Sequence, residues 1–240
     1  MKRLCAILAC CALLVGLAAL PAAAKPRQIT KAKPETTDIL FILDESGSMF
    51  GLSSDTIGGY NSFIEKQKKE PGEARLTTVL FNSTYRVLGS QVDLKRVPLL
   101  TSREYSPTST TALYDAVGRA VSDLKKSLQE EGRASEKVIV LIVTDGQENS
   151  SVEFRLSQVQ KLIADCRKSG WEFVYMGANV ESAKEASSIG ISRKNAMDFA
   201  PSANGLQNVF DSAQEAVKNF RSTGDVGKWQ QYDDSKPVKP

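Results

Sequence analysis

The sequence predicts a three-layer α/β/α sandwich with a mostly parallel central sheet and one antiparallel strand at its edge. Two continuous apolar runs, residues 39–43 and 138–143, are typical of strands that helices cover on both faces. Helical stripes of apolar residues alternate with the predicted strands, which favours the α/β class. One link between strands is too short for a parallel crossover, and this indicates the antiparallel strand.

Six strands are predicted along the chain. Residues 39–43 form the first, and the next two, residues 76–81 and 85–88, are separated only by residues 82–84. A link of this length permits a hairpin, so one of these two strands runs antiparallel at an edge of the sheet. The remaining strands are expected at residues 138–143, which are rich in β-branched side chains, and at residues 172–176 and 196–199.

Three helices are predicted from apolar residues that recur three and four positions apart. Their stripes run over residues 113–128, 156–166 and 206–220. Cys166 lies on the apolar face of the second helix, so we interpret it as a small core residue rather than a reactive thiol. Strands that alternate with such helices make the expected fold Rossmann-like, with ligand-binding loops at the carboxyl ends of the strands.

The first 24 residues have the composition of a secretory signal peptide. A positive start precedes an uncharged stretch, residues 4–24, which is broken by Pro21 and ends in three alanines. We therefore expect cleavage after Ala24 and a secreted or periplasmic protein. The apolar run is also just long enough for an uncleaved membrane anchor. The triplet before Cys11, Leu8-Ala9-Cys10, only faintly resembles a lipoprotein cleavage box.

One domain is predicted over residues 38–222, between two polar ends. Residues 25–37 are basic and contain two prolines, so an extended tether is expected there. Residues 223–240 are expected to form a flexible tail. Removal of the signal peptide leaves Cys166 as the single cysteine, so the domain depends on its core rather than on an internal disulfide.

The composition excludes several classes of function. The chain contains no histidine, which rules out Ser-His-Asp and Cys-His catalysis and any zinc site that needs imidazole. The formal charge is +3, and Lys2 and Arg3 of the signal peptide supply two of these charges. No nucleic-acid partner is therefore expected, nor any membrane contact beyond the signal or anchor. The sequence also has no phosphate-cradling Gly-x-x-x-x-Gly-Lys-Ser/Thr motif.

Oxygen-bearing side chains follow the two strongest predicted strands. Asp44, Ser46 and Ser48 come after the first, and Asp145 comes after the second. A third polar segment, residues 108–112, precedes the first predicted helix. Helix capping explains any one of these loops alone. Because all three are expected at one edge of the sheet, they favour a site for a hard cation: Mg²⁺, with Mn²⁺ or Ca²⁺ as alternatives.

These residues resemble a known family, the von Willebrand factor A-type (VWA) domain with its metal-ion-dependent adhesion site (MIDAS). The similar motifs are Asp44-x-Ser46-x-Ser48, Thr111 in Thr-Ala-Leu-Tyr-Asp-Ala, and Asp145 in Val-Thr-Asp-Gly. The resemblance covers roughly residues 37–222. It is closest to compact bacterial members, which have stretches similar to residues 63–67 and 171–179.

The resemblance implies that Ser46, Ser48 and Thr111 ligate the metal through hydroxyls. It also implies that Asp44 and Asp145 act directly or through water. The family often has Gly-Gly before the threonine, whereas this chain has Ser109-Thr110, so Thr110 competes with Thr111 as the ligand. The spacing to Ala112-Leu113 favours Thr111. Glu148 is interpreted as a solvated loop residue.

The family resemblance favours a non-enzymatic binding module over two alternatives. A metal held mainly by neutral hydroxyls keeps much of its positive charge, and the family implies that a carboxylate of a protein partner then binds it. The first alternative is a Mg²⁺-dependent hydrolase that uses the same metal pocket. The second is a structural or assembly domain. The sequence indicates neither the partner nor the oligomeric state.

Overall fold

The computed structural model describes residues 36–133, 137–178 and 181–230. Within these residues, six strands form one sheet in the order β3-β2-β1-β4-β5-β6. Only β3 is antiparallel to its neighbour, β2, and it lies at the edge of the sheet as predicted. The strands are β1 (Thr37–Asp44), β2 (Ala74–Phe81), β3 (Tyr85–Asp93), β4 (Lys137–Thr144), β5 (Glu172–Gly177) and β6 (Ala196–Asp198).

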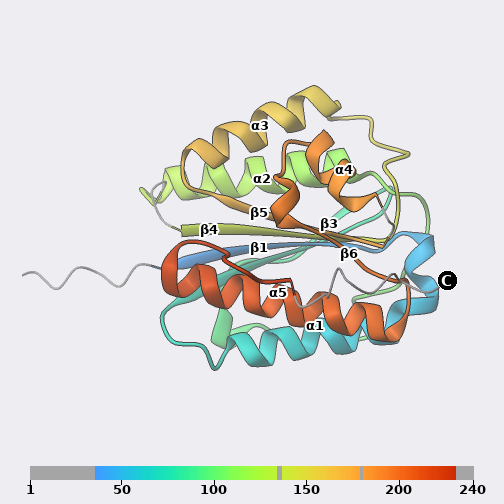
Figure 1. Cartoon of the computed structure of the whole chain (residues 1–240), viewed down its shortest axis with the longest axis horizontal. Helices are drawn as coiled ribbons and strands as arrows, with labels where there is room; N and C mark the ends of the chain where they lie inside the picture. Colours follow the sequence, from blue (N-terminus) through green and yellow to red (C-terminus); the bar gives the residue numbers. More distant parts are fainter. Residues whose placement is uncertain (1–35, 134–136, 179–180, 231–240) are drawn as a thin grey trace, which may run out of the picture. The chain divides into compact units, whose positions relative to one another are not determined.

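The helices lie between the strands in sequence and cover both faces of the sheet (Figure 1). On one face lie α2, α3 and α4, and on the other lie α1 and α5. The α-helices are α1 (Ser53–Gln67), α2 (Leu113–Glu130), α3 (Leu156–Lys168), α4 (Ser182–Ser188) and α5 (Ala203–Thr223). Shorter 3₁₀ turns are η1 (Gly47–Leu52), η2 (Leu94–Arg96) and η3 (Arg193–Asn195). The predicted three-layer Rossmann-like sandwich is confirmed.

Alternate residues of the central strands build two separate cores. Ile39 and Phe41 of β1 pack with residues of α1 and α5, whereas Leu40 and Ile42 pack with residues of α2 and α3. Every residue of β1 is buried, because helices cover both sides of the sheet. The continuous apolar run of this strand is the sequence signature of that environment.

The structure adds features that the apolar periodicity did not predict. Helices α1 and α4 were not among the three predicted stripes, and β3 extends to Asp93 rather than to residue 88. In α1, the buried face includes Thr56 and Gly59, which carry little hydrophobic signal. In α4, seven residues are too few to display a helical repeat.

The two predicted ends of the chain differ in how far the structure describes them. The signal peptide and residues 25–35 of the tether lie outside the described residues. Strand β1 begins at Thr37, the last residue assigned to the tether. Residues 224–230 lie within the predicted flexible tail, and in this segment Val226 and Trp229 are each only 2% exposed. Both side chains join the core beneath α1 and α5 because they are large and apolar.

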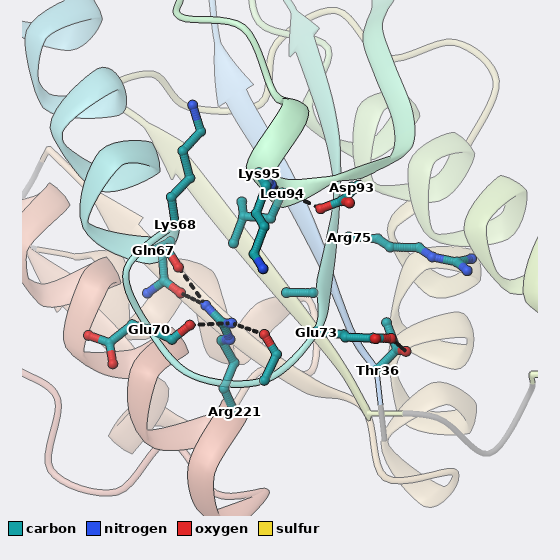
Figure 2. Close-up of a pocket in the computed structure, with 12 residues that line it drawn as sticks. Thr36, Gln67, Lys68, Glu70, Glu73, Arg75, Asp93, Leu94, Lys95 and Arg221 are labelled. Carbon is teal, nitrogen blue, oxygen red and sulfur yellow. Dashed lines mark hydrogen bonds between the residues drawn. The ribbon is translucent and has the colours of Figure 1, made fainter. Parts of the chain in front are cut away.

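Arg221 ties the end of α5 to the turn that links α1 with β2 (Figure 2). Its guanidinium donates to the carbonyl oxygens of Gln67, Glu70, Pro71 and Gly72 at 2.8–3.2 Å. A cavity of about 300 Å³ at the end of the sheet where β1 and β2 begin is lined by Arg221, Gln67, Glu70 and Gly72, among others. The predicted metal ligands lie at the other end of these strands, where β1 and β4 finish. No helix within the described ranges is long and apolar enough to cross a membrane.

Candidate metal centre

Three loops meet where β1 and β4 end, as the sequence predicts. Asp44 is the last residue of β1, and Asp145 directly follows Thr144 at the end of β4. The loop before α2 contacts the loop after β1 through two backbone hydrogen bonds: Thr108 N donates to Glu45 O at 2.9 Å, and Gly47 N donates to Ser109 O at 2.9 Å. It contacts the loop after β4 through Asn149 N, which donates to Thr111 O at 3.0 Å. These contacts place the three polar segments side by side.

A chain of polar contacts connects three of the predicted ligands. Ser46 Oγ lies 3.0 Å from Ser48 Oγ, and Ser48 Oγ donates to Asp145 Oδ1 at 2.6 Å. Ser48 and Asp145 are 97 positions apart in the sequence, so this contact exists only because the two strands are neighbours. Ser46 is buried, whereas Ser48 is exposed and Asp145 is partly exposed. The site is thus open to solvent on the side of Ser48.

Asp44 forms the buried floor of the site. Its Oδ1 accepts from Ser46 N at 2.6 Å, and its Oδ2 accepts from Thr144 Oγ1 at 2.5 Å. Burial raises the pKa of Asp44 from 3.8 to about 6, and the nearby charge of Asp145 acts in the same direction. Burial also raises the pKa of Asp145, while its hydrogen bond from Ser48 opposes this change. Two carboxylates with raised pKa values favour a neutralising cation.

Thr111 approaches the site against the glycine that follows Asp145. A Cβ atom added to Gly146 would lie 2.7 Å from Thr111 Oγ1, so only glycine leaves room for this hydroxyl. Thr111 is 3% exposed. By contrast, Thr110 is exposed. The structure thus brings Thr111 against the Asp145-Gly146 segment.

Glu148 is not a solvated loop residue, and this expectation is corrected. Its carboxylate accepts hydrogen bonds from the backbone amides of Tyr114, Ser150 and Ser151 at 2.8–3.0 Å. Tyr114 lies in the first turn of α2, where amides lack partners within the helix and favour a negative charge. Glu148 therefore holds the loop after β4 against the start of α2, next to Thr111.

Three further residues support the site, although sequence reasoning did not single them out. Thr144 donates to Asp44, as described above. Tyr105 Oη donates to the carbonyl oxygen of Asp44 at 2.8 Å. Asn149 Oδ1 accepts from the amide of Thr111 at 2.9 Å. Only Thr144 had a sequence signal, because a hydroxyl at the end of a buried strand, beside Asp145, points to the same edge of the sheet.

The donor set fits a hard divalent cation. Neighbouring ligands of an octahedral ion with bonds of about 2.1 Å lie about 3.0 Å apart. The two serine oxygens already have this separation, 3.0 Å. No group of three or more Asp, Glu, Cys or His side chains suited to a metal occurs in the described part of the chain. A cation here would therefore need hydroxyl ligands in addition to the carboxylates of Asp44 and Asp145.

The fold and this oxygen-rich edge define a class of α/β domains with a candidate cation site. The family model of the von Willebrand factor type A domain matches residues 38–219, well over half of the chain. The protein belongs to the VWA family. No curated protein matches the sequence.

Solved structures with the same fold include proteins from distant organisms. The mussel byssus protein PTMP1, with a zinc-occupied MIDAS motif, has 17% identity and a TM-score of 0.55, and the match covers 77% of this chain and 46% of that one. Manganese-loaded TRAP from Plasmodium vivax has 16% identity and a TM-score of 0.52, covering 73% and 72%. The pilus adhesin SpaC from Lactobacillus rhamnosus GG has 13% identity and a TM-score of 0.56, covering 79% and 30%. This chain therefore corresponds to less than half of the mussel and pilus proteins.

Proposed function

We propose that this chain is an exported VWA domain that binds a divalent cation and uses it to bind a protein partner through an acidic residue. The observation that carries the proposal is the contact chain from Ser46 through Ser48 to Asp145, which joins the ends of β1 and β4. In the proposed site, Ser46, Ser48 and Thr111 are hydroxyl ligands. Asp44 and Asp145 bind directly or through water.

Mg²⁺ is the proposed ion, with Mn²⁺ and Ca²⁺ as alternatives. Zinc and manganese in the names of two similar structures support a divalent cation at this edge. With three neutral hydroxyls and two carboxylates against about six coordination positions, at least one position is left for water or a partner. A hard cation there prefers an anionic oxygen, such as a carboxylate. The function is non-enzymatic in this proposal, and the lack of histidine supports it.

Calorimetric titration of residues 25–240 with Mg²⁺ and Mn²⁺ tests the metal site. Asp145→Ala is expected to weaken binding at least 100-fold, because it removes the more accessible carboxylate. The circular dichroism spectrum should stay unchanged, since the two cores contain no metal ligand. Asp165→Ala is the matched control, because Asp165 lies in the last turn of α3, which leads to the start of β5, whereas the three loops lie where the parallel strands β1 and β4 end. Equal affinity in all three proteins contradicts the assignment.

Capture of a partner from the cell envelope tests the adhesive role. Binding is expected in Mg²⁺ and absent in chelator, with the fold intact in both conditions. Substitution of one acidic residue of the captured partner should remove the interaction. Equal binding in both conditions means that the partner docks elsewhere, and turnover of a phosphoester panel with Mg²⁺ would favour a hydrolase. N-terminal sequencing of the exported protein tests cleavage after Ala24.

A further inference from the structure

Glu45 is a buried carboxylate between two residues of the candidate metal centre, Asp44 and Ser46. Its side chain is only 6% exposed. Its amide donates to the carbonyl of Phe81 at the end of β2, at 2.6 Å, and its carbonyl accepts from the amide of Thr108 at 2.9 Å. Glu45 therefore lies where β1, β2 and the loop before α2 meet.

Arg86 of β3 supplies the countercharge for this carboxylate. Its Nη2 atom lies 2.8 Å from both Glu45 Oε1 and Oε2, and it also donates to the carbonyl oxygen of Glu104 at 2.6 Å. The amide of Ser106 donates to Glu45 Oε1 at 2.6 Å. A buried carboxylate is tolerated only when it is paired and hydrogen-bonded. Glu45 has both kinds of partner, and all of them come from β3 or the loop before α2.

We propose that Arg86 is a positioning residue for the metal centre. Through Glu45 it fixes the loop of Ser46 and Ser48 against the segment that leads to Thr111. It also pairs the Glu45 charge within the protein, so that this charge does not add to those of the two aspartates. The inference rests on the proposed metal site and adds β3, a strand that supplies none of the proposed ligands. Groups that orient metal ligands typically account for 10- to 100-fold in metal affinity.

Titration with Mn²⁺ of the wild type and three variants tests this role. Arg86→Ala is expected to raise the Kd for Mn²⁺ about tenfold or more. Arg86→Lys should raise the Kd by a smaller factor, because lysine keeps a positive charge near Glu45. Some loss of affinity should remain, since lysine cannot reproduce the planar guanidinium contacts. Arg75→Ala is the matched control, because Arg75 lies at the start of β2 and forms a partly exposed ion pair with Glu131. The Kd of this variant for Mn²⁺ should equal that of the wild type.

Hydrogen exchange in chelator gives a second readout that needs no metal. Arg86→Ala should speed exchange in peptides covering residues 45–48 and 104–111, with no change in those covering β4 or α3. A general loss of stability would speed exchange in all of these elements. If the wild type binds Mn²⁺ and the Arg86 variants match it in affinity and exchange, the positioning role is wrong. If the wild type itself does not bind Mn²⁺, the proposed function fails, and the role of Arg86 fails with it. If Arg86→Ala does not fold, Arg86→Lys and Glu45→Gln carry the same test.

Discussion

Asp44 shows how a buried carboxylate is held by hydrogen-bond donors, with no cationic partner among the residues that the structure describes. Ser46 N and Thr144 Oγ1 donate to its two oxygens, and these bonds favour the charged form. Burial outweighs them and raises its pKa to about 6. The residue is therefore poised to gain from a positive charge in the site.

This shift makes the stability of the metal-free domain depend on pH. An unfolded Asp has a pKa of about 3.9, so between about pH 4 and pH 6 the folded state holds a proton that the unfolded state has released. The contribution of Asp44 to the free energy of unfolding thus falls as the pH rises through this window. Asp44→Asn should abolish this decrease in the free energy of unfolding.

Chemical denaturation in chelator at pH 4 and pH 7 measures this difference. Relative to the wild type, Asp44→Asn is expected to gain about 2–3 kcal/mol in free energy of unfolding between the two pH values. The sign follows from the raised pKa, because the charged carboxylate is the disfavoured form in the folded state. Parallel pH profiles for the two proteins would contradict the assignment of the shift to Asp44.

For individual residues of the candidate site, the sequence predicted the position of a side chain better than it predicted the partners of that side chain. Asp44, Ser48 and Asp145 could be placed together because the ends of adjacent parallel strands share an edge. The role of Glu148 could not, because its bond to Tyr114 depends on how the loop after β4 folds back on α2. Arg86 was missed for a similar reason. A charged residue in a predicted edge strand usually faces solvent.

Among the elements, α1 contains two adjacent glycines in opposite environments. A Cβ atom on Gly59 would lie within 2.6 Å of two ring atoms of Phe210, so α1 and α5 approach closely only because this residue has no side chain. A Cβ atom on Gly58 would meet nothing within 4 Å. Gly59 therefore sets the spacing between α1 and α5, whereas Tyr60 and Phe63 of α1 pack on Phe41 of the sheet.

Alanine substitutions at these two glycines are expected to act in opposite directions. Gly58→Ala should stabilise the protein by about 0.5–1 kcal/mol, because alanine loses less conformational entropy in a helix. Gly59→Ala should destabilise it by about 1–3 kcal/mol, since the added methyl group overpacks the seam with Phe210. Urea denaturation of both variants checks this, and an equal effect of the two would show that the seam adapts without cost.

The sequence predicted some helices and strands better than others. The long apolar periods of α2, α3 and α5 predicted helices because each buries a continuous stripe. The signal for α1 was weak because Thr56, Gly59 and Gln67 occupy buried positions. Strand β3 was underestimated because most of its residues are only partly buried or exposed, so the alternation that marks a strand is lost.

On the scale of the whole molecule, the segment after α5 closes one of the two cores. Trp229 lies in the core beneath α1 and α5, and the side chain of Gln230 donates to the carbonyl oxygen of Ala196 on the edge strand β6. Asn219 holds the segment by donating to the carbonyl oxygen of Val226 at 3.0 Å. Residues 226–230 thus contact α5, β6 and one of the two cores.

Trp229→Ala is therefore expected to lower the free energy of unfolding by about 3–5 kcal/mol, as for other buried tryptophans. Lys228→Ala is the matched control, because Lys228 is an exposed neighbour in the same segment. Thermal and urea denaturation of both variants measure the difference. Similar midpoints for the two variants would mean that residues 224–230 contribute little to stability.

The two cores also give the protein a pair of internal optical reporters. The sequence has two tryptophans. Trp171 is 4% exposed in the core under α2 and α3, and Trp229 is 2% exposed in the other core. Trp171→Phe and Trp229→Phe each leave one fluorophore, whose emission shifts to the red when its own layer admits water. Because β1 and β4 contribute side chains to both layers, the fluorescence of the two variants should change at the same denaturant concentration. Different midpoints would reveal an intermediate in which only one of the two cores is unfolded.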